Sequence, residues 1–209
     1  MAQYFSVHAA DPQPRLIRQA AEILRHDGLI IYPTDSCYAF GCLATAAAAT
    51  ERMRSQRGFG PQHHLTLICR DLAQAGAFVR MDDVVFRLIK AVTPGPITFI
   101  LPAVRELPRR VLHAKRKTIG LRIPSHPVAL ALLRELEQPL LSATLLLPGA
   151  DEALAEPLEA RAQLEPVVDL IIDAGPGDTV PSSVLDCTET PPRLLRRGQG
   201  VLPAWLDAG

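Results

Sequence analysis

Short continuous apolar runs alternate along this chain with segments that have helical spacing. The runs are residues 29–32, 65–69, 97–101, 119–123, 140–147 and 167–172, and a further apolar run spans residues 38–43. A run of four to eight apolar residues bounded by Gly, Pro or polar residues is typical of a buried strand. We therefore predict a series of strands that are buried on both faces.

Between these runs, apolar residues recur at the spacing of one helical face. This pattern predicts helices at residues 15–26, 84–92 and 128–136, and an alanine-rich segment predicts another at residues 44–57. Gly58 follows the alanine-rich segment where a helix ends, Asp82 precedes the next helix where a cap belongs, and Pro157 can begin a further short helix.

The alternation predicts an α/β or α+β fold with one twisted, mixed sheet and flanking helices. Residues 1–209 form a single domain in this interpretation, because neither an internal repeat nor a long linker divides the chain. The glycines fit neither the Rossmann fingerprint nor a P-loop, so a nucleotide would be held in another way.

Composition narrows the class of protein. The chain is 48% apolar, yet no apolar run approaches the ~20 residues of a membrane span, and no signal peptide is indicated. We expect a cytoplasmic protein with reduced thiols. Its four cysteines lack the paired spacing of a metal site, so we expect buried thiols and no metal.

Charge is balanced in total but uneven along the chain. There are 22 basic and 22 acidic residues, while residues 105–122 contain seven Lys or Arg and a single acid. Six of these cations make up a candidate RNA-binding surface: Arg105, Arg109, Arg110, Lys115, Arg116 and Lys117. Because no aromatic residue lies among them, contacts to the phosphates of double-stranded RNA are favoured over base stacking. A solvated surface without a partner is the alternative.

The most informative stretch is GLIIYPTDSCYAFGC at residues 28–42. A predicted strand ends there in Thr34, Asp35 and Ser36, a polar turn that a rigid scaffold could present to a small ligand. An ordinary turn that bonds its own backbone is the other interpretation. We expect Cys37 to be a buried thiol, and the adjacent His63 and His64 to lie in a solvated loop.

The motifs resemble those of the YrdC-like family, which includes the threonylcarbamoyl-adenylate synthases, and the YciO branch most of all. They are YPTDSCYAFGC, TPGPITFIL, GLRIPSHP, PLLSATLLLPG, PSSVLDCT and LLRRG, in family order across nearly the whole chain. The resemblance implies a twisted sheet with a concave, basic cavity. It also implies synthesis of an adenylate from threonine, bicarbonate and ATP for tRNA modification, or binding of double-stranded RNA.

The resemblance also implies roles for individual residues. Those matched to substrate contacts are Thr34, Arg122, Ser142 and Ser183, and those matched to nucleotide contacts are Arg57, Thr144 and Arg196. ATP with Mg²⁺ is the expected ligand, and no tightly bound cofactor is expected. Arginine can grip a carboxylate or phosphate through two parallel bonds, and strand hydroxyls can donate to phosphate oxygens.

Several family positions are altered. Arg57 stands where the synthases have lysine, Phe59 replaces an arginine, Thr144 a serine and Leu146 an asparagine, while Ile68 occupies the place of a histidine. Fixed cations and amide donors stabilise charge that develops during adenylate formation. Three functions therefore stay open: an ATP-dependent enzyme, an RNA-binding protein and a nucleotide-binding protein without either activity. No catalytic residue is identified.

Overall fold

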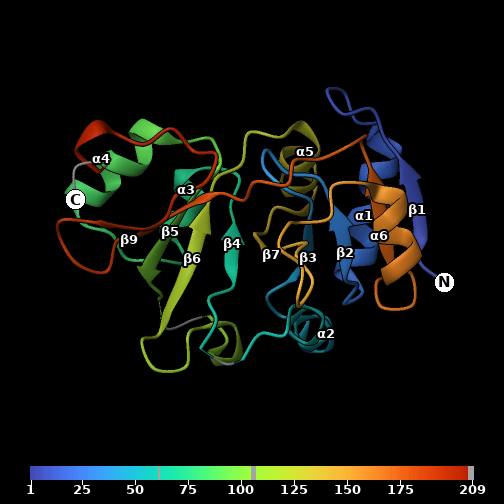
Figure 1. Ribbon diagram of the computed structural model, residues 1–209, viewed down its shortest axis with the longest axis horizontal. Helices are drawn as coiled ribbons and strands as arrows, with labels where there is room; N and C mark the ends of the chain where they lie inside the picture. The colour runs from blue at the N-terminus through green and yellow to red at the C-terminus, as the bar shows by residue number, and fades with distance from the viewer. Residues whose placement is uncertain (61, 105–106, 207–209) are drawn as a thin grey trace.

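The chain folds around a mixed sheet that contains ten strands within the described residues (Figure 1). The structure is a computed structural model and describes residues 1–60, 62–104 and 107–206. Its strands are β1 (Gln3–Ser6), β2 (Ile30–Tyr32), β3 (Ala39–Leu43), β4 (Thr66–Ile68), β5 (Ile97–Pro102), β6 (Thr118–Arg122), β7 (Leu140–Thr144), β8 (Leu170–Asp173), β9 (Ser183–Asp186) and β10 (Arg193–Arg196).

Six α-helices lie within the same residues. They are α1 (Pro14–Arg25), α2 (Ala47–Arg57), α3 (Leu72–Gly76), α4 (Asp83–Val92), α5 (Pro127–Leu136) and α6 (Pro157–Leu164). Two short 3₁₀ turns, η1 (Arg109–Val111) and η2 (Ala204–Leu206), complete the set. Local signals explain several ends: the Asp82 carboxylate accepts the Val85 N–H at the start of α4, and Gly58 adopts a left-handed conformation (φ 61°) after α2.

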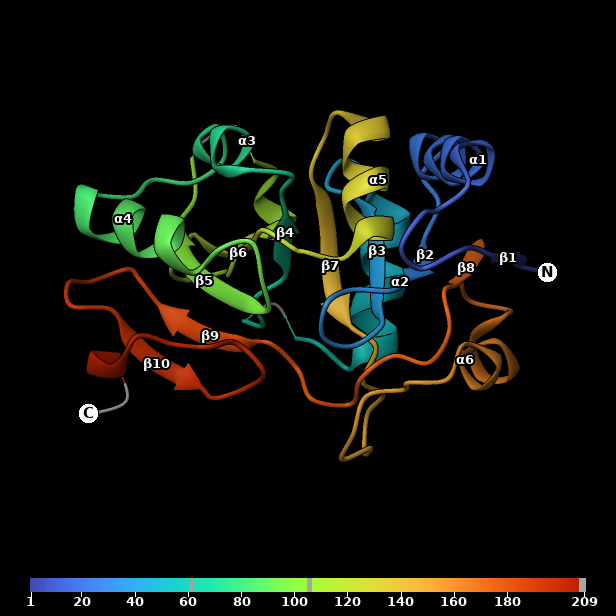
Figure 2. The same cartoon turned by 90° about the horizontal axis from the view of Figure 1, so that it is seen from above.

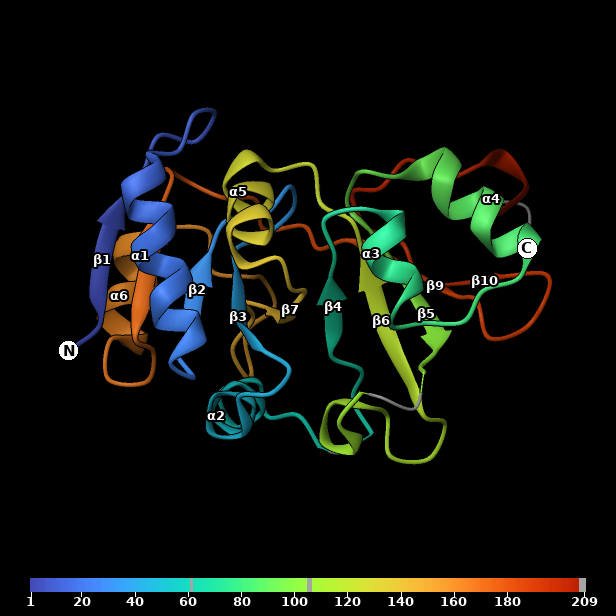
Figure 3. The same cartoon turned by 180° about the vertical axis from the view of Figure 1, so that it is seen from behind.

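The strand order is β1-β8-β2-β3-β7-β4-β6-β5-β9-β10, with parallel and antiparallel neighbours mixed. The short strand β4 joins the two halves, because it pairs antiparallel with β7 and parallel with β6. Figure 3 shows β4 between these two neighbours, with β1, β8, β2 and β3 beyond β7. Segments from distant parts of the chain are thereby fixed side by side in the middle of the sheet.

Helices α1, α3, α4 and α5 cover one face of the sheet, as Figure 2 shows. Strand residues whose side chains are fully buried supply the core, among them Leu67, Phe99, Leu121 and Leu141. Because successive side chains of a strand point to opposite faces, the residues next to these four point away from the helices. That second face holds the candidate site.

The predicted fold class and every predicted strand and helix are present, and the four cysteines are buried. Element ends differ: the second helix begins at Ala47 rather than at residue 44, and β8 begins at Leu170 rather than at 167. The strands β1, β9 and β10 and the helix α3 were not predicted. In the described part of the chain, no helix has both the length and the apolarity to cross a bilayer.

Candidate functional site

A cavity of about 190 Å³ lies on the sheet face opposite the four covering helices. Alternate residues of four adjacent strands form its floor: Ser142 and Thr144 of β7, Thr66 and Ile68 of β4, Gly120 and Arg122 of β6, Thr98 and Ile100 of β5. A Cβ atom at Gly120 would lie 2.7 Å from Thr66 Oγ1. The glycine therefore keeps the floor open where three strands meet.

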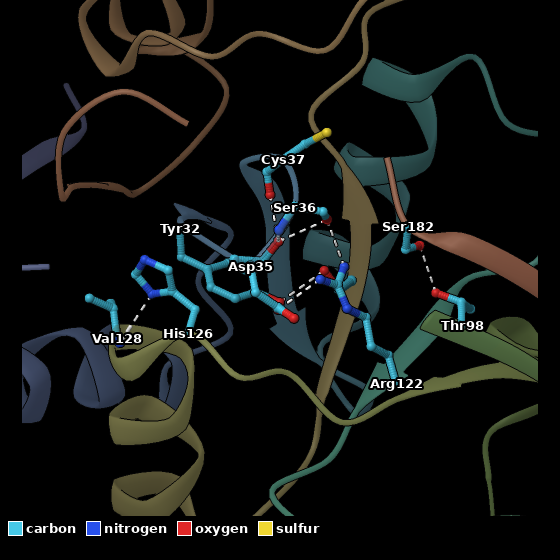
Figure 4. Close-up of polar contacts among 11 residues, drawn as sticks. Tyr32, Asp35, Ser36, Cys37, Thr98, Arg122, His126, Val128 and Ser182 are labelled. Atoms are coloured by element: carbon cyan, nitrogen blue, oxygen red, sulfur yellow. Dashed lines mark hydrogen bonds and ion pairs between the residues drawn. The ribbon is translucent and has the colours of Figure 1, made fainter. Parts of the chain in front are cut away.

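The polar turn that follows β2 reaches over this floor and is tied to Arg122 (Figure 4). Arg122 Nη2 donates to Asp35 Oδ1 at 2.7 Å, and Nη1 donates to Ser36 Oγ at 2.9 Å. The two charged side chains are 7% and 10% exposed. Arg122 is thus placed in the cavity as predicted, but two of its donors are used within the protein.

The hydroxyl of Thr34 is fully used by its own turn. Thr34 Oγ1 donates to the Cys37 carbonyl at 2.7 Å, accepts the Ser36 N–H at 3.2 Å and contacts Ser36 Oγ at 3.2 Å. The structure therefore brings Thr34 to the cavity, as the family motif implies, and gives its hydroxyl the role of holding the turn.

Ser142 also lines the cavity, but its proton faces the protein. Its hydroxyl donates to the Phe40 carbonyl at 2.8 Å and accepts the Tyr32 hydroxyl at 3.0 Å. Burial raises the pKa of Tyr32 to about 12, so this phenol stays protonated. Because a hydroxyl has one proton, Ser142 can meet a ligand in this arrangement only as an acceptor, and its role as a substrate contact stays a prediction.

Arg57 and Arg196 face the same cavity. Burial and, secondarily, the charge of Arg196 lower the pKa of Arg57 to about 10. The Arg57 guanidinium lies 4.4 Å from the centroid of the Phe59 ring, and the His63 ring stacks on Phe59 at 4.1 Å. Since both partners lie against one ring, they occupy its two faces. Phe59 therefore supports Arg57.

Arg196 is fixed by the strand beside it. Its Nε and Nη2 atoms donate to the Ser182 carbonyl at 3.2 and 2.9 Å. The Ser182 side chain lines the cavity and shares a 2.9 Å hydrogen bond with Thr98 Oγ1. Arg196 has further N–H donors that it does not use for Ser182, and these can bind an anion in the cavity.

Ser183 was the predicted substrate contact, but it is not among the described residues that line this cavity, whereas its neighbour Ser182 is. Ser183 lies opposite Ile97 in the β5–β9 ladder, on the strand face that points away from the cavity. Its hydroxyl accepts the Gly198 N–H at 3.0 Å and donates to the Gly200 carbonyl at 3.4 Å. Strand alternation, applied to the Pro-Ser-Ser-Val segment from β5 outward, would have identified Ser182.

His64 belongs to the cavity wall and not to a solvated loop. Its Nε2 atom shares a 2.8 Å hydrogen bond with Thr118 Oγ1, and its ring lies 4.6 Å from the His113 ring. Burial, His113 and Arg116 lower the pKa of His64 to about 4. His63 is exposed in the loop before β4, as predicted, and stacks on Phe59, so only His64 departs from the prediction.

The remaining candidate positions divide between the cavity and the surface. Thr144 lines the cavity, whereas Leu146 lies beyond the end of β7 and is not among the residues that line it. Cys37 is buried, and burial raises the pKa of its thiol to about 11, so the thiol stays protonated at neutral pH. Within the described residues, no three His, Cys, Asp or Glu side chains cluster as a metal site would require.

Of the predicted RNA-binding residues, Arg109 and Arg110 lie in the turn η1, and Lys115, Arg116 and Lys117 lie in the segment between η1 and β6. Arg109, Arg110, Lys115, Arg116 and Lys117 are exposed and are called the basic surface below. Arg110 donates to the Ala44 and Thr45 carbonyls, and Arg116 is paired with Asp186. Arg105 lies outside the described residues.

Known proteins match this chain over most of its length. A family model named Sua5_yciO_yrdC and described as "Telomere recombination" matches residues 22–198. The uncharacterized protein YciO of Escherichia coli K12 is 46% identical over 206 residues, which cover 99% of this chain and 100% of that protein. The crystal structure of E. coli YciO superposes with a TM-score of 0.94 at 47% identity, over 96% of this chain and 98% of the other.

Longer relatives carry functional names. Threonylcarbamoyl-AMP synthase of Bacillus subtilis is 31% identical over 205 residues, which cover 95% of this chain and 56% of the synthase. The crystal structure of Pyrococcus abyssi Sua5 complexed with L-threonine superposes with a TM-score of 0.85 at 27% identity. That match covers 93% of this chain and 57% of the other. The chain thus spans little more than half of these two proteins.

The position of His64 leads to a prediction about pH. We expect His64 to titrate near pH 4 in the folded protein, against its ordinary value of 6.5. Between these values the unfolded chain binds more protons, so folding stability should decline as the pH falls from about 6.5 towards 4. Residue-resolved NMR titration measures the pKa, and urea unfolding at pH 7 and pH 5 measures the stability.

The substitution His64→Gln should reduce this loss of stability, whereas His8→Gln, at an exposed position near the N-terminus, should leave it unchanged. A His64 midpoint close to 6.5 would contradict the buried, neutral histidine described above.

Proposed function

This chain belongs to the Sua5, YciO and YrdC family, and on that basis we propose a nucleotide- and RNA-binding protein related to the threonylcarbamoyl-AMP synthases. In this proposal adenylate synthesis is absent or very slow. The observation that carries it is the cavity itself: Arg57 and Arg196 face it in addition to the paired Arg122, and no carboxylate is among the described residues that line it.

The two arginines support binding of an anion. Arg57 is held on Phe59, and Arg196 is held by Ser182. Burial lowers the pKa of both arginines. The charge of Arg196 lowers the pKa of Arg57 further, and the charge of Arg122 acts in the same direction on Arg196. Two like charges placed close together and partly desolvated are stabilised by an anionic ligand. A phosphate group, alone or in ATP, suits this geometry because guanidinium donors match its oxygens. With no carboxylate in the lining, Mg²⁺ would enter bound to the nucleotide.

The altered positions argue against efficient adenylate synthesis. Phe59 stands where a cation is implied, and its ring is committed to Arg57 and His63. Leu146, in the place of an amide donor, lies outside the cavity lining. Removal of one donor aimed at developing charge typically costs about 10²–10³ in rate. An active synthase that uses ATP, threonine and bicarbonate is the alternative function.

Three residues of the basic surface favour RNA as a partner. Arg109, Lys115 and Lys117 are exposed, while Arg110 and Arg116 already bond to protein groups. Phosphate contacts of this kind position a protein on an RNA helix without reading its sequence.

The first prediction of the proposed function concerns the anion. Arg57→Ala and Arg196→Ala should each weaken binding of ATP or inorganic phosphate by at least about tenfold, because a charged hydrogen bond contributes about 1.5–3 kcal/mol. Isothermal titration calorimetry measures the affinity. Arg193→Ala is the matched control, since Arg193 lies on the same strand but lines a different cavity. Equal affinities in all three variants would remove both arginines from the site.

The second prediction concerns turnover. Incubation with labelled ATP, threonine and bicarbonate should release little pyrophosphate compared with a threonylcarbamoyl-AMP synthase assayed in parallel. The double substitution Phe59→Arg and Leu146→Asn should raise any residual rate by restoring two donors. Rapid adenylate formation by the unmodified protein would establish the alternative function instead.

The third prediction concerns RNA. The triple variant Arg109→Ala, Lys115→Ala, Lys117→Ala should bind duplex RNA more weakly and lower the magnitude of the log–log salt slope by up to about 3. Filter binding at several salt concentrations measures both. The control variant Arg15→Ala, Arg18→Ala, Lys90→Ala makes the same charge change at exposed positions on α1 and α4. The basic surface is not the RNA site if the two variants have the same slope.

A further inference from the structure

The hydroxyls beside Arg122 have no proton left for a ligand. A serine or threonine hydroxyl donates one proton and accepts two hydrogen bonds. Thr34 gives its proton to the Cys37 carbonyl, so in its 3.2 Å contact with Ser36 the serine must be the donor. Ser142 gives its proton to the Phe40 carbonyl. These three hydroxyls therefore present only lone pairs.

Two of the three still have a lone pair free. Ser142 accepts from the Tyr32 hydroxyl, and Ser36 accepts from Arg122 Nη1, which leaves one acceptor position on each. Thr34 accepts from both the Ser36 N–H and the Ser36 hydroxyl and is saturated. Figure 4 shows Tyr32, Ser36 and Arg122 gathered at this end of the site. At the Ser36 and Ser142 hydroxyls, only a ligand group that donates can bond.

Two other residues that line the cavity have the opposite character. Arg57 and Arg196 can only donate, and they favour an anion there. The cavity therefore offers donors at these two arginines and acceptors at Ser36 and Ser142, which are called the acceptor end below.

Charge decides which kind of donor suits the acceptor end. Asp35 neutralises Arg122, and no carboxylate is found among the described residues that line the cavity. The positive charges of Arg57 and Arg196 would repel an ammonium group, and no lining carboxylate would offset that repulsion. A neutral hydroxyl carries no net charge and is not repelled.

Size limits the ligand as well. A volume of about 190 Å³ is below the ~300–1,000 Å³ typical of small-molecule sites, so the enclosed part holds a compact group. We propose that the group held by Arg57 and Arg196 is a phosphate monoester whose own neutral hydroxyls donate to Ser36 and Ser142, one proton to each. Glycerol phosphate and the ribose phosphate of a nucleotide have this chemistry. The inference rests on the proposed anion site and specifies its ligand.

The test compares three phosphate monoesters of similar size by calorimetry at one pH and salt concentration. Glycerol 3-phosphate should bind about tenfold more tightly than propyl phosphate, which lacks the hydroxyls, because each hydrogen bond made is a modest net gain. Phosphoethanolamine, which replaces them with an ammonium group, should bind more weakly than glycerol 3-phosphate. Equal affinities for glycerol 3-phosphate and propyl phosphate in the unmodified protein would overturn the inference while leaving the anion site intact.

A double variant provides a second measurement. Ser142→Ala with Tyr32→Phe removes the acceptor together with the hydroxyl that bonds to it, so no buried donor is left without its partner. Propyl phosphate should bind this variant as it binds the parent, and the advantage of glycerol 3-phosphate should shrink. An undiminished advantage would place the hydroxyl elsewhere. If none of the three phosphates binds the unmodified protein, the proposed anion site is wrong and this inference is wrong with it.

Discussion

The candidate site depends on the buried ion pair between Asp35 and Arg122. The two residues belong to opposite halves of the sheet, since Asp35 follows β2 and Arg122 ends β6. Burying two charges is costly, and the pair is stable only where hydrogen bonds compensate; removing one partner of such a pair typically costs about 3–5 kcal/mol. Arg122 also bonds Ser36, so the pair fixes the turn that carries Thr34 and Ser36 above the floor.

In the proposed function, this constraint limits what Arg122 can offer to a substrate. A guanidinium that already bonds a carboxylate and a hydroxyl has fewer N–H donors available, so it binds the carboxylate of a free amino acid more weakly. Elsewhere in the cavity, Phe59 supports a cation instead of supplying one. The scaffold is thus shared with the synthases, while the groups free to meet a ligand are a pair of arginines and a set of acceptors.

The sequence was sufficient for the fold because apolar runs, helical spacing and capping residues each act over a few neighbouring positions. It also placed Ser142 and Thr144 on one face, since alternation is a local rule. It did not distinguish Ser183 from Ser182, because motif matching does not fix which of two adjacent serines points inward. It could not assign protons: Ser142 and Tyr32 are 110 residues apart, and their bond exists only after the sheet has formed.

The floor of the cavity and the apolar core are made from the same strands, with one residue for the site and the next for the core. In β6, Leu121 packs in the core between Gly120 and Arg122, which both line the cavity. A slip of one position would carry a guanidinium into the apolar layer and a leucine into the polar one. An insertion or deletion within one of these strands would therefore disrupt the core and the ligand site at the same time. We expect changes in chain length to be tolerated only in the connecting loops.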